Sequence, residues 1–202
     1  MSYSDFTIEE VKLRFSLRLE EDRDLYATIA PVEISPLLRE TLAENVPLAL
    51  AISTEKARSE FIIAPVLLEA RRQANHQASL FSGIEFTVDA ELGLKGVCDF
   101  LLSRSSEQLT IEAPVVAVVE AKNENMKAGI GQCLAEMVAA RLFNERKGRD
   151  EQAVYGVVTT GNNWKFLQLL GNAAQVDLVE YHIKETGRII GIIKAMLLGQ
   201  TA

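Results

Sequence analysis

Glu120 and Lys122 close an unbroken apolar run that begins at Ala113. Small, mostly β-branched residues between a proline and a charged end are typical of a strand buried on both faces. Side chains two positions apart on a strand point to the same face, so this carboxylate and this ammonium group lie together. Each costs several kcal/mol at the end of a buried strand if it is left unpaired. We therefore expect compensating groups here, and the pattern favours a metal ion and a phosphodiester.

The Glu-x-Lys triplet is not specific by itself, since it occurs three times, at residues 10–12, 120–122 and 145–147. The first and third lie in charged segments with helical character, where such pairs are ordinary solvated pairs. The second alone closes a buried strand. A strand end is also where a chain returns to solvent, so charges there can be without function.

Composition limits the classes of protein. A chain of 202 residues buries roughly 70% of its unfolded surface, enough for one substantial core. The composition, 48% hydrophobic and 24% charged, is that of a globular protein. A net charge of -7 argues against a polycation that coats nucleic acid, although an enzyme can bind phosphate through a metal ion. Cys98 and Cys133 form no metal or disulfide pattern and are predicted core thiols. We find no signal peptide and no membrane span, so we expect a cytoplasmic protein without a membrane partner.

The elements around the triplet predict how it is positioned. An amphipathic helix is predicted over residues 127–147 and an apolar strand over 153–159. Strand, helix and strand in this order imply a right-handed crossover, with the triplet's strand parallel to the next one. Upstream, residues 84–89 and 97–102 are predicted to form an antiparallel meander with that strand. The remaining predicted elements are helices in 6–15, 36–47, 53–73 and 188–198 and strands in 16–20, 164–169 and 176–182.

Two further carboxylates are candidates for the same site. Asp99 lies inside an apolar strand that neighbours the strand of Glu120, so the two can converge; a lone buried Asp is more often a structural hydrogen-bond acceptor. Glu60 lies beside the apolar stripe of the helix predicted from Ser53 to Gln73, and we expect it to point inward, although a partly exposed acid is an equal alternative. Glu69 is expected to be a solvated partner of neighbouring polar residues.

An acidic helix, an Asp-bearing strand, Glu-x-Lys closing the next strand and a helix with an early Gln resemble the PD-(D/E)XK nuclease superfamily. This superfamily includes restriction endonucleases, lambda exonuclease-like enzymes and Holliday-junction resolvases. The resemblance covers residues 53–170, and its motif residues are Glu60, Asp99, Glu120, Lys122 and Gln132. The Pro that names the motif is absent, and Cys98 stands before Asp99.

The resemblance implies an α/β (α+β) fold with a restriction endonuclease-like core, in which helices flank a mixed sheet of about five strands in the order α-β-β-β-α-β. We expect a single domain over 1–202, with an N-terminal layer (1–50), the nuclease-like core (53–170) and a C-terminal strand and helix (171–202).

The resemblance also implies roles for individual residues. Asp99, Glu120 and the carbonyl of Ala121 would bind Mg²⁺ or Mn²⁺, and Glu60 would complete the shell or hold a second ion. Lys122 would orient the attacking water or stabilise developing charge, and Gln132 would position Lys122 or the substrate. Asp99, Glu120, Lys122 and Gln132 are thus the expected catalytic residues.

The leading expectation is a metal-dependent nuclease, endonuclease or exonuclease, that acts on DNA. Arg71, Arg72, Lys127 and Lys165 are candidates for phosphate contacts, and a homodimer is expected if two strands are cut. The first alternative is a catalytically silent module that binds a protein or serves as a structural subunit, which the acidic charge favours. The second is hydrolysis of a small phosphoester at the same site.

Overall fold

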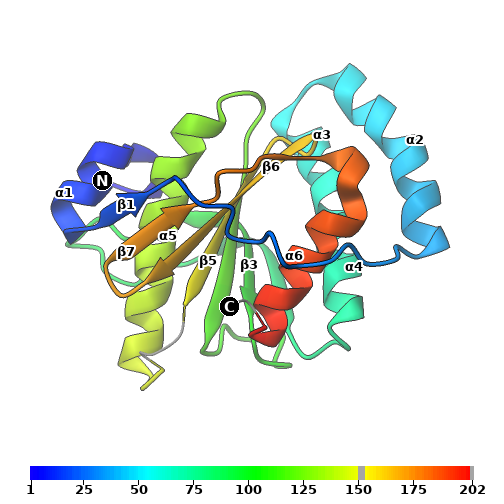
Figure 1. Cartoon of the computed structure of the whole chain (residues 1–202). Coiled ribbons are helices and arrows are strands. Elements are labelled where there is room, and N and C mark those ends of the chain that lie inside the picture. Colours follow the sequence, from blue (N-terminus) through cyan, green and yellow to red (C-terminus); the bar gives the residue numbers. More distant parts are fainter. Residues whose placement is uncertain (150–152, 201–202) are drawn as a thin grey trace.

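The computed structural model describes residues 1–149 and 153–200, which form one eight-stranded sheet with helices on both faces (Figure 1). The strands are β1 (Arg18–Glu20), β2 (Ser79–Glu85), β3 (Val97–Ser103), β4 (Val115–Ala121), β5 (Val154–Thr159), β6 (Asn163–Leu170), β7 (Ala173–Val176) and β8 (Tyr181–His182). The α-helices are α1 (Ile8–Phe15), α2 (Pro36–Ile52), α3 (Glu55–Arg58), α4 (Ala64–Gln73), α5 (Met126–Arg146) and α6 (Thr186–Leu198).

The sheet has mixed polarity. Its order is β1-β7-β6-β5-β4-β3-β2, with β8 pairing with β6 off this path. Strands β2, β3 and β4 form an antiparallel meander, and α5 then connects β4 to the parallel strand β5. The α/β class, the flanking helices and the parallel pairing of β4 and β5 were predicted and are confirmed. The predicted sheet of about five strands was too small, because β1, within the strand predicted over 16–20, also joins it. In place of the single strand predicted over 176–182, two short strands, β7 and β8, join the sheet as well.

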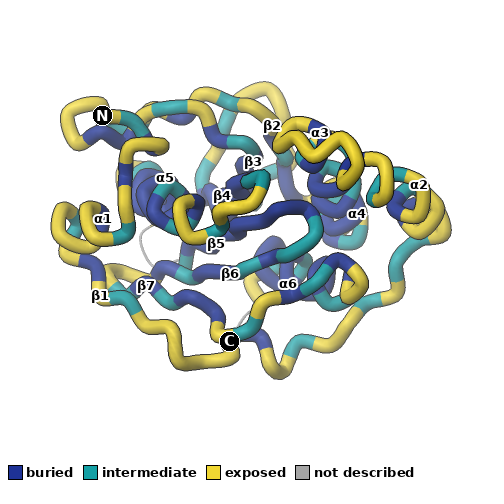
Figure 2. Tube along the Cα trace, turned by 90° about the horizontal axis from the view of Figure 1, so that it is seen from above, coloured by how far each residue is buried: buried dark blue, intermediate teal, exposed yellow. Residues whose placement is uncertain are grey.

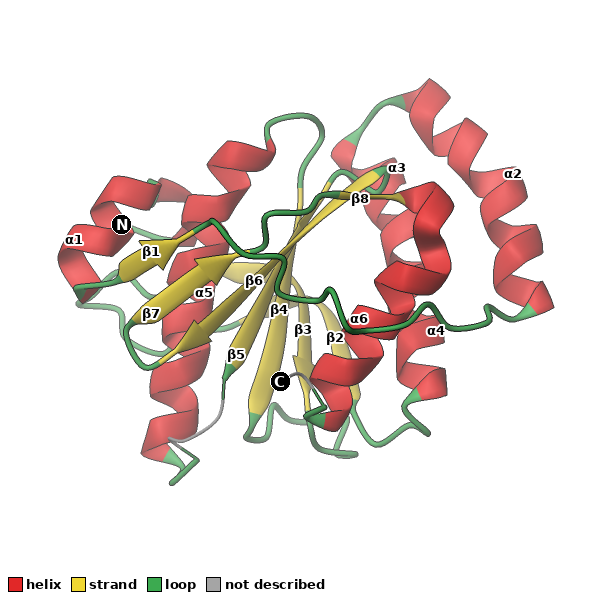
Figure 3. Cartoon of the chain, viewed as in Figure 1, coloured by secondary structure: helices red, strands yellow, loops and turns green. Residues whose placement is uncertain are grey.

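Helices cover the two faces of the sheet in separate layers (Figure 3). On one face, α5 and the N-terminal α1 enclose a core that includes Cys133, Leu134 and Val118. On the other face, α4 and α6 enclose a core that includes Trp164 and Phe166, and α2 packs outside α4. Figure 2 shows the central strands buried and α2 largely exposed. None of the helices in the described ranges combines the length and the apolar character that a membrane span requires.

Strand β2 begins five residues earlier than predicted. Residues 79–83 precede the predicted strand, but they lie in β2, and residues 79–82 pair with β3. Gly83, directly before the predicted strand, adopts a φ of +60° within β2. The end of the predicted strand leaves the sheet, and there the amide of Phe86 donates to the carbonyl of Gly96. A glycine in a strand can mark a local irregularity rather than its end.

Helix α2 continues past the proline at which it was expected to end. Pro47 lies inside the helix and is exposed, as is Ala43, whose carbonyl would have accepted the missing amide. Water can satisfy that carbonyl, so the usual cost of an interior proline is reduced here. The helix then ends at Ser53, which adopts the left-handed conformation. Ser53 therefore ends α2, and Thr54 caps α3 with its side chain.

The predicted helix over 53–73 contains a wide turn. Helix α3 passes directly into a π-helical turn, η2 (Ser59–Ile63), and then into α4. The proline at position 65, which has no amide hydrogen, follows this turn at the start of α4. A π turn carries one residue more than an α turn and interrupts the regular ladder at such points. It also changes which residues of this segment face the sheet.

Candidate functional site

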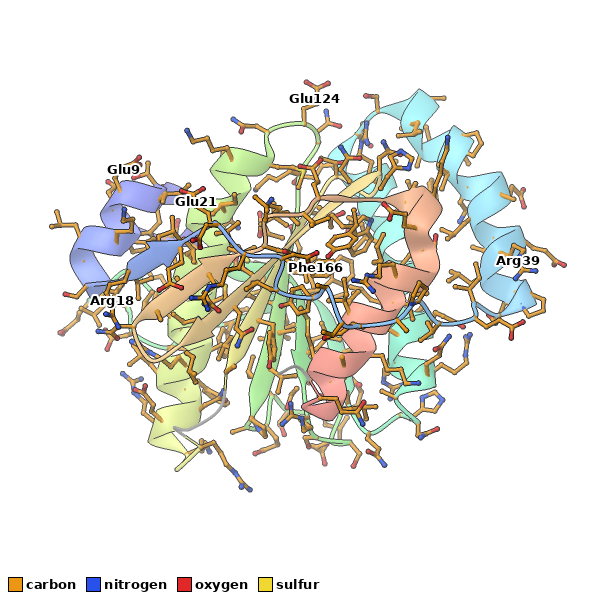
Figure 4. The ribbon with its side chains drawn as sticks, viewed as in Figure 1. Glu9, Arg18, Glu21, Arg39, Glu124 and Phe166 are labelled. Carbon is orange, nitrogen blue, oxygen red and sulfur yellow. The ribbon has the colours of Figure 1, made fainter. Side chains whose placement is uncertain are left out.

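Glu120 and Lys122 form an ion pair at the end of β4. The Glu120 side chain is 2% exposed and that of Lys122 is 21% exposed. The buried carboxylate is therefore covered by a lysine whose ammonium group still reaches solvent. The loop that follows leads into α5, and Glu124 points outward from it at the edge of the molecule (Figure 4). The predicted shared face of the two side chains is confirmed.

Asp99 lies beside Glu120 on the neighbouring strand. Phe100 pairs with Val119 in the β3–β4 register, and one further step in this register places Asp99 opposite Glu120. Side chains at opposed positions of antiparallel strands share a face. The amide of Ala121 donates to Asp99 Oδ2 at 2.8 Å, which fixes this carboxylate against the end of β4. The two carboxylates are thus brought together from adjacent strands.

Gln132 links the lysine and Glu120 from α5. Its Nε2 donates to Glu120 Oε2 at 2.8 Å, and its Oε1 accepts from Lys122 Nζ at 3.2 Å. Asn125 caps α5 by accepting from the amide of Ala128, so the helix begins directly after the loop. Gln132 lies in the second turn of α5, where it faces the end of β4. The expectation that Gln132 positions Lys122 agrees with these contacts.

The surroundings of Glu120 make this carboxyl group difficult to ionise. Burial, and then the charge of Asp99, raises the pKa of Glu120 to about 7, although Lys122 opposes the rise. Burial also raises the pKa of Asp99, against the lowering effects of the Ala121 amide and Lys122. Burial lowers the pKa of Lys122, but the hydrogen bond and charge of Glu120 outweigh it, and the net change is upward. The lysine is therefore a cation at neutral pH.

Glu60 does not join this group. Its side chain is 53% exposed and forms an ion pair with Lys56 at 2.9 Å. The expectation that Glu60 points inward is wrong, because the π turn changes the phase of the helix at this residue. The expectation that Glu69 is solvated is also wrong. Its carboxylate is 2% exposed and accepts from the amide and hydroxyl of Ser35, where it supports the start of α2.

The structure places three other polar residues near the site. The charge of Glu55, at the start of α3, acts on both Glu120 and Lys122. Arg58 is buried and donates to Asn123 Oδ1 at 3.1 Å and to the carbonyl of Thr160 at 2.9 Å, so it ties together the loops after β4 and β5. No sequence signal pointed to either residue.

The third is Glu136, one turn after Gln132 on α5. It is fully buried, and its Oε1 accepts from Gln132 Nε2 at 3.1 Å. The spacing of four residues indicated that Glu136 shares the face of Gln132, but not that it is buried.

Three of the four predicted phosphate contacts are engaged elsewhere. Arg71 and Arg72 lie in the last turn of α4, where Arg71 donates to the carbonyl of Ala78 and Arg72 binds Glu69. Lys165 donates to the carbonyl of Leu178 from β6. Lys127 is exposed in the first turn of α5, beside the loop that carries the site.

The donor set suits a hard cation with two protein carboxylates. No three Asp, Glu, His or Cys side chains within residues 1–149 and 153–200 lie so that they could hold one metal ion. Asp99 and Glu120 supply oxygen ligands, and Mg²⁺ commonly binds through one or two carboxylates and completes its octahedron with water and substrate oxygens. This donor chemistry is compatible with Mg²⁺ or Mn²⁺, which Asp99 and Glu120 would hold.

No protein-family model matches the chain, and no curated protein matches it. The resemblance to PD-(D/E)XK nucleases therefore stays a prediction.

Proposed function

We propose that this chain is a Mg²⁺- or Mn²⁺-dependent nuclease that hydrolyses phosphodiester bonds in DNA. One observation carries the proposal: Asp99 and Glu120 meet from opposed positions of two neighbouring strands, beside the Glu120–Lys122 ion pair. Two carboxylates and a partly exposed lysine on adjacent strands provide negative ligands for a cation and a positive group for a phosphate. A purely structural ion pair would not require the second carboxylate.

Asp99 and Glu120 are the proposed metal ligands, together with the carbonyl of Ala121. The bond from the Ala121 amide leaves the other oxygen of Asp99 free of hydrogen bonds from the described residues. When bound, a divalent ion would lower the pKa of a water molecule and neutralise charge on the phosphate. Asp99 and Glu120 would hold that charge at the end of the sheet.

Lys122 is the proposed contact to the substrate. Its ammonium group is protonated at neutral pH and partly exposed, so it donates hydrogen bonds rather than accepting a proton. Its role is therefore to orient a water molecule or to stabilise negative charge on the phosphate. Gln132 holds both Lys122 and Glu120 and sets the distance between them.

Single substitutions test this assignment. We expect Asp99→Asn and Glu120→Gln to abolish metal-dependent cleavage of linear and circular DNA, because each removes a metal ligand. We expect Lys122→Ala to lower the rate by about 10²- to 10⁴-fold, as for an acid–base or electrostatic group. Glu60→Gln is the matched control, since Glu60 is exposed and paired with Lys56, and it should cleave as wild type.

A catalytically silent module is the second candidate. Lys122 and Gln132 already occupy both oxygens of Glu120, and the net charge is -7. A melting series with and without millimolar Mg²⁺ or Mn²⁺ separates the two functions. The nuclease should gain stability from the metal, and Asp99→Asn should lose that gain. If wild type gains no stability and all three site variants melt below it, the carboxylates are structural partners of Lys122 and the nuclease proposal is wrong.

A further inference from the structure

Glu136 is a buried acid that packing does not explain. Its side chain is fully buried on α5, and its Oε2 has no hydrogen-bond partner among the residues that the structure describes. An unpaired polar atom in the interior costs folding free energy, and an apolar side chain of similar size would avoid this cost. Such a group is retained where it serves something other than stability.

The residues around Glu136 leave its second oxygen unpaired. Tyr3, Cys98 and Cys133 lie close enough that the charge of Glu136, after burial, contributes to raising their pKa values. The hydroxyl of Tyr3 donates to the carbonyl of Phe86, and the thiol of Cys133 is directed to the carbonyl of Val157. The one bond that Glu136 makes to a described residue is therefore the bond that its Oε1 accepts from Gln132.

That bond decides how the amide of Gln132 is oriented. An amide group has two N–H donors on nitrogen and one acceptor oxygen. Gln132 Nε2 donates both to Glu120 and to Glu136, at 2.8 Å and 3.1 Å, so its Oε1 is left to accept from Lys122. If the amide turned over, its oxygen would face both carboxyl groups and its nitrogen would face the ammonium group. Glu136 therefore favours the orientation that holds Glu120 and Lys122 together.

We propose that Glu136 is a positioning residue, which fixes the Gln132 amide so that Glu120 and Lys122 are set for a divalent cation and a phosphate. This inference rests on the proposed nuclease function. Substituting a residue that hydrogen-bonds to metal ligands typically lowers metal affinity or activity by about 10- to 100-fold. The one hydrogen bond that links Glu136 to the site, among the described residues, comes from Gln132, and Glu136 itself would touch neither substrate nor metal.

Substitutions at Glu136 separate positioning from packing. In the full chain, we expect Glu136→Leu to melt at or above the temperature of wild type without metal, because it removes the unpaired buried oxygen. Its Mn²⁺ affinity, measured by calorimetry, should fall about 10- to 100-fold, and kcat should fall with KM for DNA unchanged. Glu136→Gln keeps an acceptor oxygen at this place and should retain the affinity and the rate.

A double-mutant cycle tests whether Glu136 acts through Gln132. Glu136→Leu should cause no further loss of Mn²⁺ affinity in a chain that already carries Gln132→Leu. A second readout needs no activity. In ¹⁵N NMR spectra of metal-free protein, the Gln132 side-chain amide should show two distinct, slowly exchanging protons in wild type and in Glu136→Gln. In Glu136→Leu these protons should exchange faster and their shifts should change.

The outcomes are distinguishable. If wild type binds no Mn²⁺ and cuts no DNA, the proposed function fails, while the NMR comparison still decides whether Glu136 fixes Gln132. The inference is overturned if Glu136→Leu leaves the Gln132 amide signals unchanged, if the two affinity losses add, or if Glu136→Leu melts well below wild type and Glu136→Gln does not restore the affinity.

Discussion

At the scale of single residues, Glu120 is held between opposing charges. The charges of Asp99 on β3 and Glu55 on α3 disfavour its ionised form, and Lys122 favours it. With burial as the largest cause, its pKa rises from 4.5 to about 7. Ionisation of this carboxyl therefore takes place in the physiological range, where a bound cation competes with a proton for the same oxygens.

This shift predicts a pH dependence of stability in the metal-free protein. Because the folded pKa is raised, the contribution of Glu120 is fully present below pH 4.5 and is lost as pH rises through about 7. Ionisation of Glu120 should lower the free energy of unfolding by about 3 kcal/mol over that pH range. Urea unfolding in buffers that contain a metal chelator measures this change. Glu120→Gln should lack this fall, and Glu60→Gln should keep it. Parallel curves for wild type and Glu120→Gln would contradict the assignment.

At the scale of elements, glycines at the contact between α5 and the sheet allow the helix to pack closely against the strands. A Cβ at Gly129 would lie 2.7 Å from Val158 Cγ1 and 3.0 Å from Lys122 Cγ. A Cβ at Gly156, on β5, would lie 2.5 Å from Met137 Sδ. The missing side chains bring the first turns of α5 against β4 and β5, and this depth buries Glu136 and places Gln132 between Glu120 and Lys122.

Gly129→Ala should therefore affect both stability and the site. We expect a loss of about 1–3 kcal/mol from overpacking, measured by denaturant unfolding, and a lower cleavage rate because the stem of Lys122 is displaced. Gly191→Ala is the matched control: its Cβ would lie 2.7 Å from the carbonyl of Ala30, on the other face of the sheet. Gly191→Ala should lose a comparable amount of stability. Its cleavage rate per folded molecule should equal that of wild type. Equal rates for both variants would show that Gly129 does not support Lys122.

The helices and strands with regular hydrophobic periods could be predicted from the sequence. Contacts between residues far apart in the sequence could not. The pairing of Glu120 with Lys122 follows from the two-residue period of a strand, and the face of Gln132 follows from the helix after it. Glu60 was misplaced because a π turn is invisible to a 3.6-residue period. Glu69 was misplaced because its partner Ser35 lies 34 positions away. The burial of Glu136 depends on how closely α5 meets the sheet, which only the three-dimensional packing fixes.

At the scale of the whole molecule, charge limits how DNA can be held. The chain carries 28 acidic and 21 basic side chains, so most of its surface repels a polyanion at long range. In the part of the chain that the structure describes, the basic groups next to the site are Lys122, Lys127 and the buried Arg58. Binding through so few cations implies a small footprint on the phosphate backbone.

The salt dependence of binding should be correspondingly shallow. With the inactive Asp99→Asn chain and a fluorescent duplex, we expect log affinity against log salt to have a slope of about -2 to -5. Lys127→Ala should make that slope less steep by about one, because one phosphate contact is lost. Arg72→Ala should not change it, since Arg72 binds Glu69 in the last turn of α4. Undetectable binding at low salt would favour the silent module.

The edge strand β1 has a consequence for biosynthesis. Its residues Arg18–Glu20 pair with Ala173–Gln175 of β7, so the ribosome must add about 155 residues between the two partners. At roughly 5–20 residues per second, this takes about 8 to 30 s. During that time β1 has no strand to pair with. Helix α5, on which α1 packs, is finished before β7 but long after α1 has been made. Until α5 has been made, Phe6 and Val11 have no helix to pack against, and this is the interval in which a chaperone would be needed.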